Sequence, residues 1–182
     1  MKSGEKKTLN QSDQNEFINS IQSSFKNTSY NFDTLKINVD ISSWIDTHKI
    51  LKKDFNLSFF NWLSAVDWDN EVKTGDAPKE PVTPSFEILS CLSQTNSNNL
   101  VISSTVISKE NAEIESLVDV FAGANWHERE AYEMFGINFL NHPNLTKLYL
   151  PDDYEGNPLL KSFELISSCL LYTSDAADDR GC

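Results

Sequence analysis

The stretch from Gly123 to Gly136, with the sequence GANWHEREAYEMFG, concentrates residues that could do chemistry. Asn125 is a residue type that commonly caps a helix, and Glu128 follows it at the capping-box spacing, in which each side chain accepts a hydrogen bond from a backbone N–H of the first turn. Gly136 suits the left-handed conformation that ends many helices. The pattern therefore predicts a short helix over about residues 126–135.

Charged and aromatic side chains are interleaved along this predicted helix. Helical spacing places Trp126, Glu130 and Met134 on one face and brings Arg129 within reach of Glu133. The charges have two interpretations: an exposed ion-pair network, which stabilises little, or a partly buried network that fixes a docking surface. Chemistry alone favours the first.

A metal centre is a further interpretation of the same residues. His127-Glu128 matches the start of the zinc-protease helix motif, but that motif needs a second histidine four residues after the first, and Ala131 stands there. A site made of His127, Glu128 and His142 would require the fold to bring them together. A free-standing metal-dependent hydrolase using these three residues is one alternative, although the spacing favours no metal ligand in this chain.

Composition narrows the function classes. The chain has 182 residues, which predicts one domain with a real core, and its net charge of −12 argues against a nucleic-acid partner. Its six glycines form no Walker loop, nucleophile elbow or dinucleotide-binding motif, so no nucleotide or cofactor site is expected. No apolar run approaches the roughly 20 residues of a membrane span, and no signal peptide follows Met1. We expect a cytosolic chain, at most peripheral to a membrane.

The elements that must position these residues follow from hydrophobic periodicity. The predicted order is helix 13–26, strand 35–41, helix 43–54, strand 57–66, strand 86–92, strand 100–107, helix 109–121 and helix 126–135. Three strands in succession, with helices before and after them, predict an α+β fold. We expect a small sheet of about four strands covered by helices, with an extended C-terminal arm.

This order divides the chain into four parts. Residues 1–12 are polar and predicted to be disordered, and residues 13–136 form the α+β domain. Residues 137–168 carry repeated turn signals and predict an extended arm, whose apolar side chains either wrap over the chain's own sheet or lie on a partner; the two are compatible. Residues 169–182 resemble sequencing-adapter read-through, so we expect them to be foreign to the natural protein. Without them Cys91 stands alone, and no internal disulfide is expected.

The motifs in and after the predicted helix resemble one family. The matching segments are Gly123–Glu130, Met134–Gly136, Asn141–Pro143, Leu150–Asp153, Glu155–Gly156 and Pro158–Leu159. Ala65-Val-Asp67 looks like the family's element at the end of an early strand. On these segments, and over about residues 40–166, the chain is similar to the 30-kDa-type C subunit of the proton-pumping NADH:quinone oxidoreductase, respiratory complex I.

The resemblance implies a non-catalytic scaffold protein of the peripheral arm, on the cytoplasmic side of the cell inner membrane. It implies that the chain docks on the hydrogenase-like D subunit and contacts other peripheral-arm subunits. The whole enzyme would transfer electrons from NADH through flavin and iron–sulfur clusters to quinone, coupled to proton translocation. Partner subunits, not this chain, would bind NADH, FMN, the clusters and quinone.

The resemblance also implies which residues order and pack the interface with these partners. The expected interface residues are Trp126, His127, Glu128, Arg129, Glu130, Phe135, Gly136, His142 and Pro143. Because an unpaired buried arginine costs several kcal/mol, Glu130 or Glu133 is expected to neutralise Arg129. The chain departs from the family's Pro-Leu-Arg-Lys-Asp at residues 158–162, where Leu160 replaces the arginine and Ser162 the acid, so contacts of this part of the arm are not implied.

Two more alternatives stay open beside the hydrolase. One is the equivalent subunit of a membrane-bound hydrogenase or a related dehydrogenase, which the neighbouring genes would distinguish. The other is a generic soluble binding module, which predicts a stable monomer without a large apolar patch.

Overall fold

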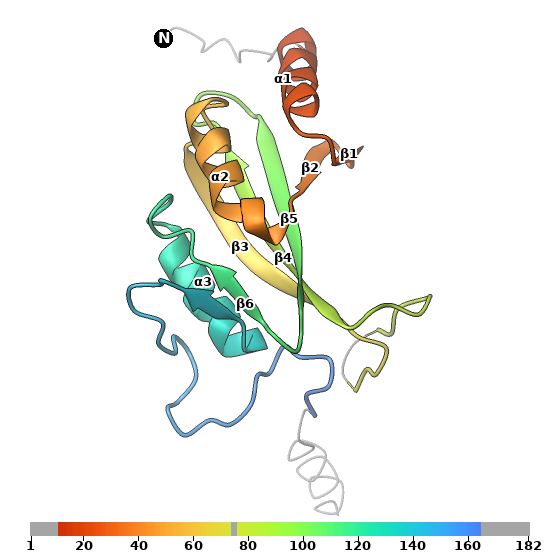
Figure 1. The fold of residues 1–182 in the computed structure, drawn as a ribbon, viewed down its shortest axis with the longest axis vertical. Coiled ribbons are helices and arrows are strands. Elements are labelled where there is room, and N and C mark those ends of the chain that lie inside the picture. Colours follow the sequence, from red (N-terminus) through yellow and green to blue (C-terminus); the bar gives the residue numbers. More distant parts are fainter. Residues whose placement is uncertain (1–10, 74–75, 165–182) are drawn as a thin grey trace, which may run out of the picture.

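The computed structural model describes residues 11–73 and 76–164, so residues 1–10 and the expected read-through at 169–182 lie outside the described part. Its centre is a five-stranded sheet with the order β1-β2-β5-β4-β3 (Figure 1). The strands are β1 (Thr28–Asn31), β2 (Thr34–Asn38), β3 (Phe59–Trp68), β4 (Ser85–Ser93) and β5 (Leu100–Ser108). Neighbours are antiparallel except for β2 and β5, which are parallel.

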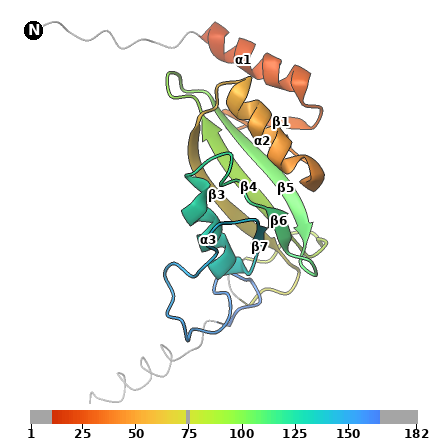
Figure 2. The same cartoon turned by 60° about the vertical axis from the view of Figure 1, so that its left-hand side comes forward.

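The helices cover one face of this sheet (Figure 2). They are α1 (Gln11–Ser24), α2 (Trp44–Lys53), which follows the 3-10 turn η1 (Ile41–Ser43), and α3 (Ala124–Phe135). The strand register places Leu35, Val101 and Leu92 side by side on the helix-covered face, and α1 and α2 pack there with Ile21 and Leu51. The predicted α+β class is confirmed.

The sheet has one strand more than expected. Strand β1 was not predicted because its sequence, Thr-Ser-Tyr-Asn, is polar and largely exposed. It pairs with β2 across a two-residue turn in which Phe32 and Asp33 both have positive φ, 51° and 56°, as in the hairpin turns that fit strand twist. The hairpin comes from turn geometry rather than from a buried apolar pattern.

The helix predicted over 109–121 is wrong. The chain there forms a short strand, β6 (Glu113–Glu115), followed by turns, and β6 pairs in parallel with β7 (Asn138–Leu140). Ile114, Leu117 and Phe121 are buried as their spacing suggested. A spacing of three to four residues also fits a strand followed by tight turns, and pairing with a strand beyond α3 decides between the two.

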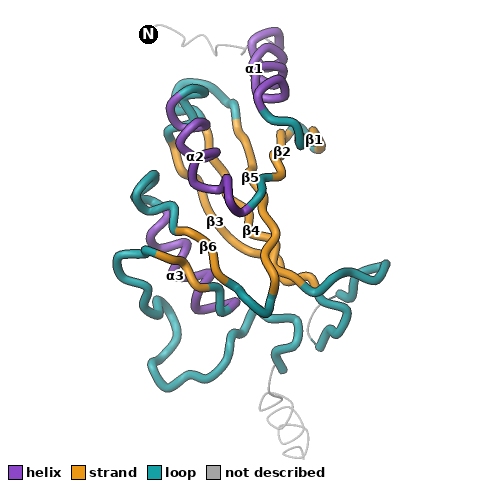
Figure 3. Tube along the Cα trace, viewed as in Figure 1, coloured by secondary structure: helices purple, strands orange, loops and turns teal. Residues whose placement is uncertain are grey.

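Beyond β7 the chain runs without regular structure from Asn141 to Glu164 (Figure 3). It returns to the domain: the N–H of Leu159 donates to the carbonyl of Met134 on α3, and Leu160 packs against the main core cluster. None of the helices in the described part is long and apolar enough to cross a membrane.

Candidate docking surface

Helix α3 begins and ends on glycines. Its N-cap is Gly123, no side chain caps it, and Asn125 already lies inside the helix, so the predicted capping box of Asn125 and Glu128 is wrong. The prediction for the other end is confirmed: Gly136 has φ +76°, and its N–H donates to the carbonyl of Tyr132 at 2.9 Å. Glu128 is free to point into the protein because it is not used at the cap.

Glu128 ties α3 to the turn after β6. It is fully buried, its Oε2 accepts a hydrogen bond from the Ser116 hydroxyl, and its Oε1 accepts one from the N–H of Leu117, both at 2.6 Å. Burial raises the pKa of Glu128 to about 7 although these two hydrogen bonds favour the ionised form. The carboxylate therefore joins α3 to the turn after β6, although burial disfavours its charged form.

His142 lies beside Glu128, with 4.0 Å between its Nε2 and the Oε2 of Glu128. Its Nε2 is 3.1 Å from the carbonyl of Asn125, and its Nδ1 accepts the N–H of Asn144 at 3.0 Å. These contacts hold the ring between α3 and the turn after β7. His127 packs on Phe60, with ring centroids 5.7 Å apart. Over the described residues, no three His, Cys, Asp or Glu side chains converge as metal ligands would.

Arg129 binds the arm rather than an acid of its own helix. Its Nε donates to the carbonyl of Thr146 at 2.9 Å and its Nη2 to that of Lys147 at 2.8 Å. The expected neutralisation by Glu130 or Glu133 is wrong, because the guanidinium is satisfied by backbone carbonyls that the sequence places 17 and 18 residues away.

Glu133 binds the next residues of the arm. Its carboxylate accepts the N–H groups of Leu148, Tyr149 and Leu150 at 3.1, 3.0 and 2.7 Å. Burial alone would raise the pKa of Glu133, but these three amides hold it below its ordinary value. Lys147 closes the following turn by donating to three carbonyls, those of residues 151, 152 and 154. Two side chains of α3 thus fix the path of the arm.

Three large apolar side chains remain exposed on α3 and the arm, among exposed polar ones. Trp126 is 67% exposed at the start of α3, Tyr149 is 64% exposed on the arm, and Leu159 is 53% exposed near the end of α3. We call these three side chains the α3–arm surface. Pro143 and Gly136 are also exposed and Glu130 is half-buried. Of the nine expected interface residues, Glu128 and Phe135 are enclosed by the domain, Phe135 against Phe86.

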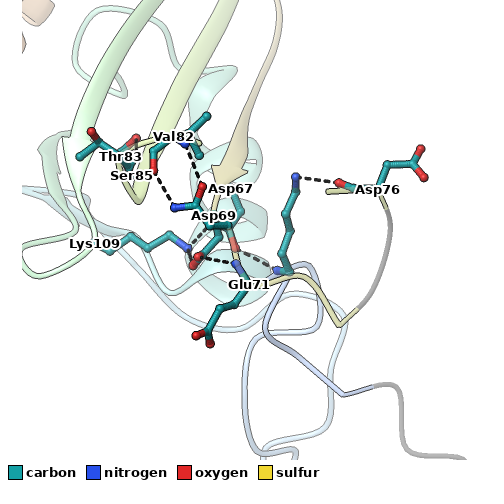
Figure 4. Close-up of polar contacts among 10 residues, drawn as sticks. Asp67, Asp69, Glu71, Asp76, Val82, Thr83, Ser85 and Lys109 are labelled. Atoms are coloured by element: carbon teal, nitrogen blue, oxygen red, sulfur yellow. Dashed lines mark hydrogen bonds and ion pairs between the residues drawn. The ribbon is translucent and has the colours of Figure 1, made fainter. Parts of the chain in front are cut away.

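A second polar cluster lies at the end of β3 (Figure 4). Asp67 is only 3% exposed and pairs with Lys109, which also binds Asp69 at 2.6 Å. The N–H of Lys161, on the arm, donates to Asp67 at 2.9 Å. A usable signal was present in the sequence: Leu63, Ala65 and Asp67 alternate on the buried face of one strand, and a buried carboxylate requires partners.

Two solved structures share the fold. The structure is similar to the trypsin-resistant fragment (1-134) of Nqo5, with a TM-score of 0.55 and 18% identity, covering 72% of this chain and 99% of that one. It is also similar to a chain of the membrane-bound sulfane sulfur reductase, an archaeal respiratory membrane complex, with a TM-score of 0.66 and 19% identity, covering 91% and 92% of the two chains. At these identities the likeness shows the fold alone, that of an α+β domain.

Sequence comparison identifies the family. The sequence model of the family "Respiratory-chain NADH dehydrogenase, 30 Kd subunit" matches residues 37–168, so the chain belongs to that family. The NADH-quinone oxidoreductase C subunit of Roseiflexus castenholzii is 36% identical over 141 residues, covering 76% of this chain and 75% of the relative. The fused C/D protein of the same enzyme in Phocaeicola vulgatus is 29% identical over 130 residues, and the chain spans 22% of its length.

Proposed function

We propose that this chain is a non-catalytic scaffold protein of an NADH:quinone oxidoreductase, and that its α3–arm surface docks on the hydrogenase-like D subunit. The complex sits at the cytoplasmic side of the cell inner membrane. There it passes electrons from NADH to quinone, coupled to proton translocation, while partner subunits hold FMN, the iron–sulfur clusters and the quinone. Family membership supports the complex, and relatives named as C/D fusions favour the hydrogenase-like protein as the neighbour.

One observation supports the docking surface: two charged side chains of α3, those of Arg129 and Glu133, bind backbone groups of the same chain. Arg129 satisfies two carbonyls and Glu133 satisfies three amides of residues 146–150. These contacts hold the arm in one conformation next to the exposed Trp126 and Tyr149. A preorganised surface with large aromatic anchors loses little conformational entropy when a partner binds.

The test is co-purification of the full chain with the hydrogenase-like partner, co-expressed from the same genome. Trp126→Ala removes an exposed aromatic without touching the core and is expected to weaken the complex at least tenfold, as central interface aromatics commonly do. Phe32→Ala is the matched control, because Phe32 is 101% exposed in the β1–β2 turn, away from α3 (Figure 1). Equal capture of both variants would reject the α3–arm surface.

The variant Arg129→Ala tests whether docking depends on the conformation of the arm. The variant leaves the carbonyls of Thr146 and Lys147 without their donor, so the arm loosens and capture falls although Trp126 is intact. Capture at the level of the unmutated chain would show that the path of the arm does not matter for docking. If the unmutated chain fails to capture the hydrogenase-like partner at all, the scaffold proposal itself fails.

A further inference from the structure

The end of the arm passes the last residues of β3, and the contact is built around Asp67. Asp67 faces the helix-covered side of the sheet with Leu63 and Ala65, and its register partner on β4 is Phe86. One carboxylate oxygen of Asp67 meets the ammonium of Lys109, which directly follows β5. A carboxylate buried to this degree needs hydrogen-bond donors for both oxygens.

The second oxygen finds its donor 94 residues along the chain. The N–H of Lys161 donates to Oδ2 of Asp67 at 2.9 Å. On the other side of the same residue, the carbonyl of Lys161 accepts the N–H of Lys73 at 2.8 Å. Lys161 is therefore held through its backbone between the end of β3 and the loop that follows β3.

Side-chain contacts also hold Lys161 and its neighbours in this place. Its ammonium lies 5.9 Å from the ring centroid of Trp68 and 3.2 Å from the carbonyl of Asp76. Leu160, one residue earlier, packs against the main core cluster. Asn157 donates to the carbonyl of Glu133 at 2.9 Å, which fixes the start of this segment on α3. Leucine suits this inward position, where an arginine would need a buried partner.

We infer that Asp67 holds residues 157–164, which we call the strap, over the end of the sheet within this chain. The backbone N–H of Lys73, in the loop after β3, holds the strap from its other side. The strap is ordered by the chain itself, before any partner is present. This gives a positioning role to Asp67 and to Lys73 in the loop after β3. The inference does not rest on docking to the hydrogenase-like partner, because the chain alone tests it.

Trypsin cleavage after Lys161 in the full chain measures how often the strap opens. In Asp67→Asn the carboxamide offers one acceptor where Lys109 and Lys161 require two, so the strap opens more often. We expect cleavage at the 161–162 bond to become about tenfold faster, as expected when a hydrogen bond to a charged group is lost. Asp69→Asn is the matched control: it removes the same charge beside the same lysine, but Asp69 does not bind Lys161.

A second pair of variants covers the case in which Asp67→Asn does not fold. Lys73→Pro removes the N–H that holds the carbonyl of Lys161, whereas Lys73→Ala keeps it and loses only the exposed ion pair with Glu164. Faster cleavage at the 161–162 bond in the proline variant than in the alanine variant supports the strap. The inference is overturned if the unmutated chain is cleaved there as fast as the variants, or if Asp67→Asn matches Asp69→Asn.

Discussion

Helices α2 and α3 cover the same face of one sheet but are held in different ways. Helix α2 buries Trp44, His48 and Leu51, and its only buried ionisable side chain is a neutral imidazole that bonds the carbonyl of Trp44 and the hydroxyl of Ser90. Helix α3 buries two carboxylates, Glu128 and Glu133, which bind distant backbone groups. One helix is fixed by packing on the sheet, and the other also fixes loops around itself.

The difference separates two uses of a buried face. Apolar burial is non-directional, so α2 contributes stability wherever the side chains fit. A carboxylate that accepts several amides is directional and determines which loop lies where. The charged helix is therefore the one beside which the arm and the α3–arm surface are organised.

The largest effect is expected from the packed helix. Leu51→Ala removes a fully buried side chain of α2 and should cost about 3 kcal/mol of global unfolding free energy. Ile50→Ala, on the exposed side of the same helix, should stay within about 0.5 kcal/mol. Urea unfolding measures both, and similar losses would show that α2 is not held by its buried stripe.

His48 makes the packed helix sensitive to acid. Burial lowers the pKa of His48 to about 4, against 6.5 for the free side chain. Between pH 4 and pH 6.5 the unfolded chain therefore binds more protons than the folded chain. Through His48, the free energy of unfolding falls by about 3 kcal/mol as the pH drops from about 6.5 to 4. His48→Gln removes this rise, so its stability in denaturant titrations should fall between pH 4.5 and pH 7, whereas that of the unmutated chain stays nearly level because Glu128 titrates with the opposite sign. An unchanged slope would mean that His48 is not the titrating group.

Glu128 should give the opposite slope. Because the pKa of Glu128 is raised to about 7, against 4.5 for the free side chain, the folded chain binds more protons between these values. The contribution of Glu128 to the free energy of unfolding therefore falls by about 3 kcal/mol from pH 4.5 to pH 7. This fall nearly offsets the rise that His48 produces. Glu128→Gln keeps the side-chain shape and should unmask the His48 slope. A variant with the same pH profile as the unmutated chain contradicts this assignment.

Glu133 should act locally. Glu133→Gln leaves one acceptor oxygen for three amides, and we expect the opening free energy of residues 148–150 to drop by about 2 kcal/mol with little change in global stability. Amide hydrogen exchange measures this directly. Glu130→Gln, three residues earlier with no side-chain bond in the described part, is the matched control. Equal exchange in the two variants would show that Glu133 does not hold the arm.

Hydrophobic periodicity predicted the helices α1 and α2 and the strands β2 to β5, because each buries a face that local spacing reveals, and the residues at its two ends predicted α3. It failed for β1, which has a polar sequence, and for residues 109–121, whose buried side chains fit a helix equally well. For α3 the sequence identified the right residues but the wrong partners. Glu133 was paired with Arg129 one turn away, although both bind residues 146–150.

The sequence by itself determined the family, the α+β class and the position of α3, since motif spacing, apolar periodicity and the glycine after the helix are local properties. Only the tertiary structure decided that Glu128 turns inward, that Arg129 and Glu133 hold the arm, and that Asp67 meets Lys161. Each of these four side chains binds at least one backbone group that is 11 or more residues away. Backbone N–H and C=O groups are chemically alike at nearly every residue. The sequence therefore does not predict which of them a buried charge will bind.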